Sequence, residues 1–140
     1  MLNKITVEGG KPMGQAIKVA FATKNHEDID AHFGGTKEFV VYDVSAEGYT
    51  LTGVVQADTS DYDGDDKTEF KVRALEGINI VYCETIGGTA AAKVIRAGIQ
   101  PMKIQEPTKI VTALDRLVQM LNGNPPPWIR RLLTKPTEEE

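Results

Sequence analysis

The chain is poor in cysteine, with Cys83 the only one among 140 residues. A single cysteine excludes an internal disulfide framework and suits a reducing compartment. The sequence also lacks any run near the roughly 18 consecutive apolar residues of a membrane span, and residues 1–14 lack the apolar block of a signal peptide. We therefore expect a cytoplasmic protein without membrane contact.

Positive charge is scarce as well. The chain carries 16 Lys and Arg residues against 20 Asp and Glu residues, which gives a formal net charge of −4 at pH 7. Nucleic-acid binding needs basic residues clustered on one face, whereas those of this chain are scattered. We expect no nucleic-acid partner, and an anionic ligand would have to be held by local groups such as helix N-termini.

Signatures of common enzyme classes are missing too. The sequence has no Gly-x-Ser-x-Gly, phosphate-loop or dinucleotide fingerprint. The first expected strand, at residues 17–23, has no aspartate for a two-metal nuclease centre. The acidic residues at 58–66 resemble a calcium loop only superficially, because a strand and not a helix is expected before them. We expect a solvated loop there and a protein that is not an enzyme.

Short β-rich runs alternate with helical patterns along the chain. Strands are expected at residues 17–22, 39–44, 49–55, 78–82 and 99–104, and helices at 66–76, 89–97 and 107–121. This order predicts an α/β fold with a five-stranded mixed sheet and helices on both of its faces. It is the layout of a ribonuclease H-like fold, here without a nuclease site.

Three finer predictions accompany this layout. In the second strand of the expected hairpin, alternation places Tyr49, Leu51, Gly53 and Val55 on one side. The spacing of residues 66–69 is that of a capping box at a helix start. Residues 1–15 are expected to be a flexible arm, residues 16–123 a single domain, and residues 124–140 a Pro-rich and acidic tail without a packed core.

The first candidate site is the loop after the first strand, where Asp30-Ala31 precedes His32, Phe33 and Gly34. Loops that leave the carboxyl ends of strands in such sheets commonly bind ligands. Imidazole binds iron, and glycine lets a bulky ligand approach the backbone. The alternative is that His32 is a loop residue packed beside Phe33. His26 is a weaker candidate.

The second candidate site is the turn after the fourth strand, which contains Cys83, Gly87, Gly88 and Thr89. Free N–H groups at the following helix start favour an anion. The structural alternative is a turn that needs glycine only for its backbone angles. Cys83 is either a thiolate ligand of iron or a small buried hydrophobic residue, and a redox role for it is the remaining enzymatic possibility.

Three segments of the sequence together resemble the dinitrogenase iron–molybdenum cofactor biosynthesis family. They are Ile-Lys-Val-Ala-Phe-Ala-Thr at 17–23, Asp-Ala-His-Phe-Gly at 30–34, and Glu-Phe-Val-Val-Tyr-Asp-Val at 38–44. The Pro-Pro-Pro-Trp-Ile-Arg-Arg-Leu-Leu segment at 125–133 also resembles the C-terminal segment of family members. The resemblance implies a ribonuclease H-like fold without nuclease activity.

The same resemblance implies a function in nitrogen fixation. It predicts a non-catalytic carrier that transiently binds an iron–sulfur precursor of the nitrogenase cofactor and passes it between the cluster-building enzyme and the scaffold complex. It carries the histidine of the His-Phe-Gly motif over to His32 and the glycine-rich turn to Gly87 and Gly88, with Cys83 as a further candidate metal ligand. The alternative is an interaction or regulatory module of the same fold with a vestigial cluster site.

Overall fold

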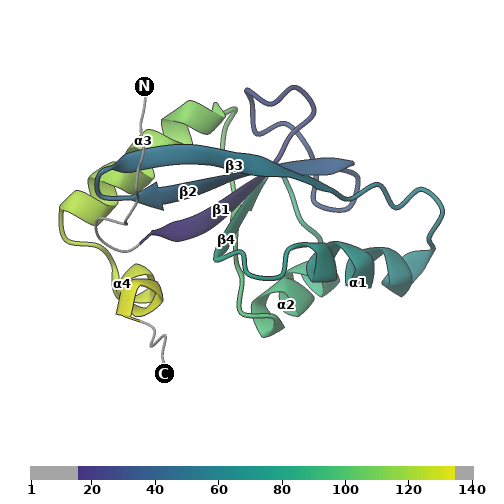
Figure 1. The fold of residues 1–140 in the computed structure, drawn as a ribbon. Coiled ribbons are helices and arrows are strands. Elements are labelled where there is room, and N and C mark those ends of the chain that lie inside the picture. The colour runs from purple at the N-terminus through teal and green to yellow at the C-terminus, as the bar shows by residue number, and fades with distance from the viewer. Residues whose placement is uncertain (1–15, 135–140) are drawn as a thin grey trace.

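The computed structural model describes residues 16–134, so the arm expected at residues 1–15 lies outside the described part. The elements are β1 (Ile17–Ala22), β2 (Glu38–Ser45), β3 (Gly48–Gln56), α1 (Gly64–Ala74), β4 (Ile80–Cys83), α2 (Gly88–Arg96), β5 (Gln100–Lys103), α3 (Ile110–Asn122) and α4 (Pro127–Thr134) (Figure 1). The strands form one sheet in the order β3-β2-β1-β4-β5.

The sheet is mixed. β1 pairs antiparallel with β2 and parallel with β4, β2 and β3 form an antiparallel hairpin, and β4 and β5 are parallel. The predicted five-stranded mixed α/β sheet is confirmed, whereas the ribonuclease H-like label stays a prediction. No helix within residues 16–134 is both long and apolar enough to cross a membrane.

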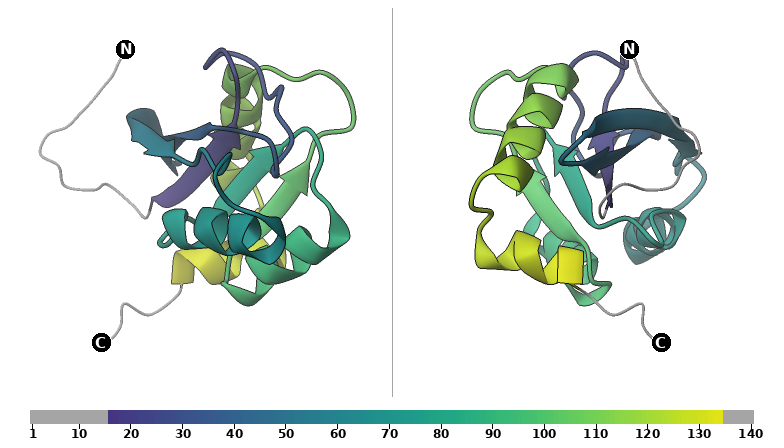
Figure 2. Two further views of the ribbon diagram at one scale, coloured as in Figure 1. Left: turned by 90° about the vertical axis from the view of Figure 1, so that its right-hand side faces the viewer. Right: turned by 60° about the vertical axis from the view of Figure 1, so that its left-hand side comes forward.

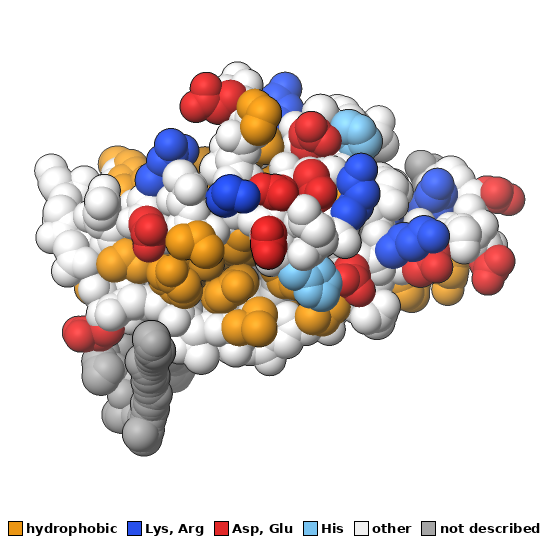
Figure 3. Space-filling view, turned by 90° about the horizontal axis from the view of Figure 1, so that it is seen from above, with side chains coloured by type: hydrophobic (Ala, Val, Ile, Leu, Met, Phe, Trp, Pro, Cys, Tyr) orange, Lys and Arg blue, Asp and Glu red, His pale blue; other side chains and the backbone are white. Residues whose placement is uncertain are grey.

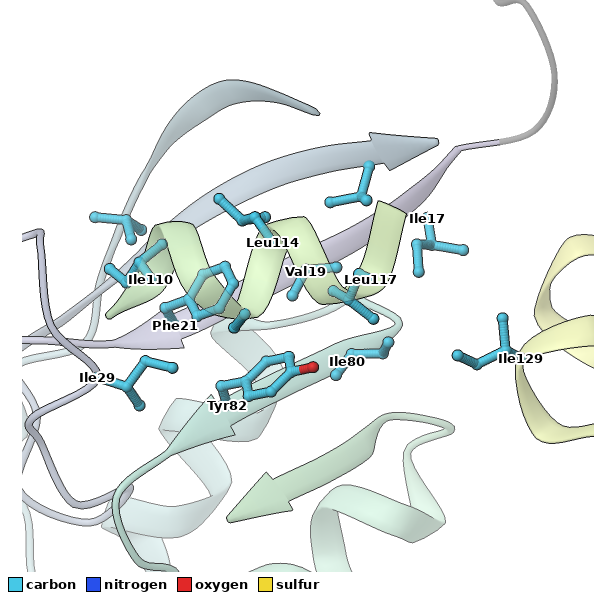
Figure 4. Close-up of a cluster of buried hydrophobic side chains, with 13 residues drawn as sticks. Ile17, Val19, Phe21, Ile29, Ile80, Tyr82, Ile110, Leu114, Leu117 and Ile129 are labelled. Carbon is cyan, nitrogen blue, oxygen red and sulfur yellow. The ribbon is translucent and has the colours of Figure 1, made fainter. Parts of the chain in front are cut away.

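Alternating side chains of the buried strands face two separate cores. Ile17, Val19 and Phe21 of β1 pack with Leu114 and Leu117 of α3, and we call this the α3-side core (Figure 4). On the other face lies the α1/α2-side core, formed by Ala20, Ala22, Phe33, Phe39, Leu75, Val81, Cys83 and Val94 with their neighbours. The right-hand view of Figure 2 shows the sheet between α3 and α1, so helices cover both faces as predicted.

A β-bulge divides β3 between the two faces. The pairing shifts between Val41, which lies opposite Gly53, and Tyr42, which lies opposite Leu51. Because side chains alternate along a strand, one unpaired residue moves everything beyond it to the other face. Tyr49 packs on the α3-side core and Val55 on the α1/α2-side core. The prediction that these residues share one side is therefore wrong.

The first helix starts earlier than the capping-box pattern indicates. α1 begins at Gly64, and its N-cap Asp63 has extended backbone angles (φ −119°, ψ 146°) but makes no capping hydrogen bond through its side chain. The capping box expected at residues 66–69 is therefore wrong, since Asp66 already lies inside the helix. The amide of Asp66 donates to the Asp63 carbonyl at 3.0 Å, which closes the first turn.

The segment expected to be an unpacked tail contains a helix. Pro127 opens α4, in the first helical position where proline is favourable because no intrahelical N–H bond is lost there. Ile129 is fully buried in the α3-side core, and Figure 4 shows its side chain reaching from α4 toward that core. The prolines therefore start an element, and the absence of packing predicted for residues 124–140 is wrong for the described part.

Candidate functional site

The loop between β1 and β2 is attached to the rest of the domain at two places. Residues 27–29 pair with residues 108–110 at the start of α3, through Ile29 N to Thr108 O at 3.0 Å and Ile110 N to Glu27 O at 2.8 Å. Residues 31–33 pair with the segment after β4, through Phe33 N to Thr85 O and Glu84 N to Ala31 O, both at 2.9 Å. His32 therefore lies on a fixed part of the loop.

The two candidate segments lie side by side. His32 is exposed, and its Nδ1 is 2.5 Å from the Thr85 hydroxyl, 53 residues further along the chain. Within residues 16–134 no hydrogen bond engages the His32 Nε2. In the tautomer whose Nδ1–H donates to Thr85, Nε2 carries the lone pair and is the nitrogen available to a metal.

Phe33 is buried beside this histidine, whereas Gly34 is exposed. Phe33 is 1% exposed and packs against Phe39 with their ring centroids 5.8 Å apart, so its ring anchors the loop in the α1/α2-side core. His32 is exposed beside it, so this histidine does not share the buried position of Phe33. Gly34 is exposed and has no heavy atom within 4 Å of an added Cβ, which leaves its backbone open.

The start of α2 lies next to this loop. Gly87 is the N-cap of α2, no side chain caps the helix, and its first turn has no acidic residue. The first helical amides, including those of Gly88 and Thr89, have no intrahelical acceptor and carry the positive end of the helix dipole. Gly87, Gly88 and Thr89 are exposed. We call His32, Gly34 and these three residues the His32 rim.

Cys83 does not belong to the His32 rim. Its side chain is fully buried in the α1/α2-side core. Burial raises the pKa of the Cys83 thiol to about 11, and the nearby Lys103 ammonium opposes this shift only in part. A buried neutral thiol is a poor ligand and a poor nucleophile. The structure therefore favours the small hydrophobic role for Cys83 over the role of metal ligand.

His26 is occupied by a structural contact. Its Nε2 pairs with the Glu38 carboxylate, and its amide donates to the Thr23 hydroxyl at 2.9 Å. The backbone of His26 has a positive φ of 67°, which suits the tight turn after β1. Figure 3 shows both histidines of the chain, in pale blue, apart from each other on the face seen from above.

Three basic residues belong to the elements around the rim. Arg96 lies in the last turn of α2, eight residues after Gly88 and therefore about 12 Å away along the helix axis. Lys24 belongs to the His32 loop, and its amide donates to Asp30 at 2.7 Å. Lys103, opposite Cys83 in the β4–β5 pairing, is a cation at this end of the sheet that the sequence patterns did not single out.

Two further residues were missed because their contacts join distant parts of the chain. Thr85 orients His32, and Lys71 of α1 is a buried lysine bonded to the far end of the same loop. A hydroxyl residue in the turn after a strand is the only local signal for Thr85. Within residues 16–134 no three side chains of His, Cys, Asp or Glu are grouped as they would be around a metal ion.

This chain is similar in sequence to a family profile and to several named proteins. A sequence profile described as "Dinitrogenase iron-molybdenum cofactor" matches residues 15–120. The protein NifX of Sinorhizobium fredii is 37% identical over 99% of this chain and 96% of its own length, and NifX of Rhodobacter capsulatus is 34% identical over 94% and 87%. The FeMo cofactor biosynthesis protein NifB of Rhizobium meliloti is 34% identical, but over 24% of its own length.

Solved structures support the same fold. The crystal structure of PH0822 has a TM-score of 0.58 and 19% identity, with 74% of this chain and 91% of that chain covered. At such identity the match concerns the fold alone. The profile covers most of the chain, and the NifX proteins of S. fredii and R. capsulatus exceed 30% identity over nearly all of it. This chain therefore belongs to the dinitrogenase iron–molybdenum cofactor family.

Proposed function

We propose that this chain is a cytoplasmic, non-catalytic carrier in the biosynthesis of the nitrogenase iron–molybdenum cofactor. It binds an iron–sulfur precursor of that cofactor and passes it from the cluster-building enzyme to the scaffold complex. Two observations outside the site support a role in this pathway: the family profile over residues 15–120, and relatives named NifX that align along nearly their whole length. NifB, a named biosynthesis protein, contains a related segment.

The binding site of this proposal is the His32 rim. The observation that carries it is the contact between His32 Nδ1 and the Thr85 hydroxyl, which holds the exposed imidazole and leaves Nε2 without a hydrogen bond to residues 16–134. A hydrogen bond to the distal nitrogen is the usual way in which proteins orient a histidine ligand. His32 Nε2 is the proposed ligand of an iron atom at the edge of the precursor.

The rest of the rim supplies backbone groups. An iron–sulfur precursor is bulky and anionic, so it needs donors and an open surface more than it needs further side chains. The uncapped amides at the start of α2 provide donors and positive potential. The exposed glycines Gly34, Gly87 and Gly88 allow the precursor to approach the backbone closely.

Sparse ligation suits a carrier. Four thiolates hold an iron–sulfur cluster permanently, whereas one imidazole and several amides bind an anion that a better ligand set can remove. The pairing of residues 31–33 with residues 84–85 keeps the imidazole and the helix start in one arrangement. The site is therefore preformed, and binding does not have to order the loop.

Anaerobic reconstitution with a purified iron–sulfur precursor tests this function. The wild-type chain should acquire the visible absorbance of the precursor, and His32→Ala should weaken binding about tenfold or more, which is the loss of one metal ligand. His26→Ala is the matched control, because it removes the other exposed histidine and leaves the rim intact. It should bind as the wild type does.

Two results would contradict the proposal. Equal binding by wild type and His32→Ala would remove His32 from the site. Failure of the wild type to bind any precursor would favour the alternative, an interaction module with a vestigial site. Thr85→Val removes the hydroxyl that orients His32 while keeping the side-chain shape, so it should weaken binding less than His32→Ala does.

A further inference from the structure

α1 carries a buried lysine whose ammonium group donates hydrogen bonds to two backbone carbonyl groups. Lys71 is 1% exposed, and its Nζ donates to Thr36 O at 2.5 Å and to Ala57 O at 2.8 Å. Within residues 16–134 no carboxylate forms an ion pair with it. Burying an amine without a carboxylate in direct contact is costly, so its two hydrogen bonds, together with the more distant Asp58 charge, must offset the loss of hydration.

The first of these carbonyls belongs to Thr36, whose amide helps to close the turn that begins at His32. The amides of Gly35 and Thr36 both donate to His32 O, at 3.2 and 3.0 Å. The Thr36 side chain is itself buried, and its hydroxyl donates to Glu38 O at 2.8 Å. Lys71 therefore binds the carbonyl of Thr36, and the amide of Thr36 binds the carbonyl of His32.

The second carbonyl belongs to the segment after β3. Ala57 N donates to Lys37 O at 2.8 Å, so Ala57 lies beside the start of β2. Lys71 thus joins three segments that are distant in sequence: the His32 turn, the chain after β3, and α1. Nothing else in the described residues links α1 to the carbonyl of Thr36.

We propose that Lys71 is a positioning residue that fixes the His32 turn from the interior of the domain. Phe33 and the pairing with residues 84–85 fix one end of the turn, and Lys71 fixes the other. An apolar side chain of similar length would fill the same space without desolvating an amine, so stability alone does not account for a lysine here. The inference rests on the proposed function only where precursor binding is concerned.

Lys71→Met tests the role, because methionine is of similar length and lacks the donors. In the free protein, hydrogen exchange of the Gly35 and Thr36 amides should become about tenfold faster, and the His32 ring resonances should shift. Amides of β1 should exchange as in the wild type, and the urea midpoint should not fall. Arg73→Met is the matched control, since it removes one exposed positive charge from the same helix. It should leave the turn unchanged.

Lys71→Gln retains one donor group and should give intermediate exchange at the two turn amides. Precursor affinity should follow the same order, with the Met variant weakest by about tenfold. Unchanged exchange at Gly35 and Thr36 in Lys71→Met would overturn the inference. So would exchange that rises equally throughout β1, or failure of both variants to fold, because either result makes Lys71 a support of the whole domain. A wild type that binds no precursor refutes the proposed function but leaves the exchange test valid.

Discussion

Thiol reactivity decides whether Cys83 has a chemical role. The chain has one cysteine, so a thiol reagent such as a chromogenic disulfide reports on Cys83 alone. Only the thiolate reacts, and burial raises the pKa of Cys83 from 9.0 to about 11. At pH 7 the thiolate fraction then falls about 100-fold, from about 1 in 100 to about 1 in 10,000. The sulfur is also fully buried, which adds the free energy of local opening.

We therefore expect labelling in the folded chain to be at least about 100-fold slower than in the urea-unfolded chain at the same pH. Cys83→Ala should show no labelling and should bind the iron–sulfur precursor as the wild type does. A folded-state rate within about tenfold of the unfolded rate would show that the thiol is accessible. In that case the assignment of Cys83 to the core is wrong, and Cys83 is again a candidate ligand.

Two further predictions concern stability. Burial, with the Lys67 charge acting in the same direction and Asp58 opposing it, lowers the pKa of Lys71 from 10.5 to about 8. Between about pH 8 and pH 10.5 the unfolded chain therefore binds more protons than the folded chain, and folding becomes more favourable as the pH rises. Over this pH range the free energy of unfolding in urea should rise by up to about 3 kcal/mol more for the wild type than for Lys71→Met, because the other titrating groups contribute equally in both chains. An equal pH dependence of the two chains would show that Lys71 is not desolvated. Because Ile129 is fully buried, Ile129→Ala should lower the free energy of unfolding by about 2–4 kcal/mol, and a loss below about 0.5 kcal/mol would show that α4 does not pack in solution.

Local sequence was sufficient for most elements of the fold. A short run that is apolar except for Lys18 predicts β1, and apolar residues at helical spacing before Asn122-Gly123 predict α3. The order of elements then gave the mixed sheet, because few topologies accommodate a hairpin followed by helix–strand units. These features are local because backbone periodicity depends on residues close in sequence.

The candidate site was predictable only in part. The sequence placed a histidine loop and a glycine turn at the carboxyl ends of two parallel strands, and the structure brings Thr85 against His32. The sequence alone could not reveal that Phe33 and Cys83 are buried while His32 and Gly34 are exposed. That choice depends on which side chains fill the α1/α2-side core.

What the sequence determined by itself was the identity and order of the elements and the residue types at the rim. Only the tertiary structure decided the bulge that divides β3, the docking of α4 through Ile129, and the burial of Lys71 against Thr36 and Ala57. Each of these depends on contacts between residues far apart in the chain, whose free energy outweighs local preference. Such contacts leave no periodic pattern in the sequence.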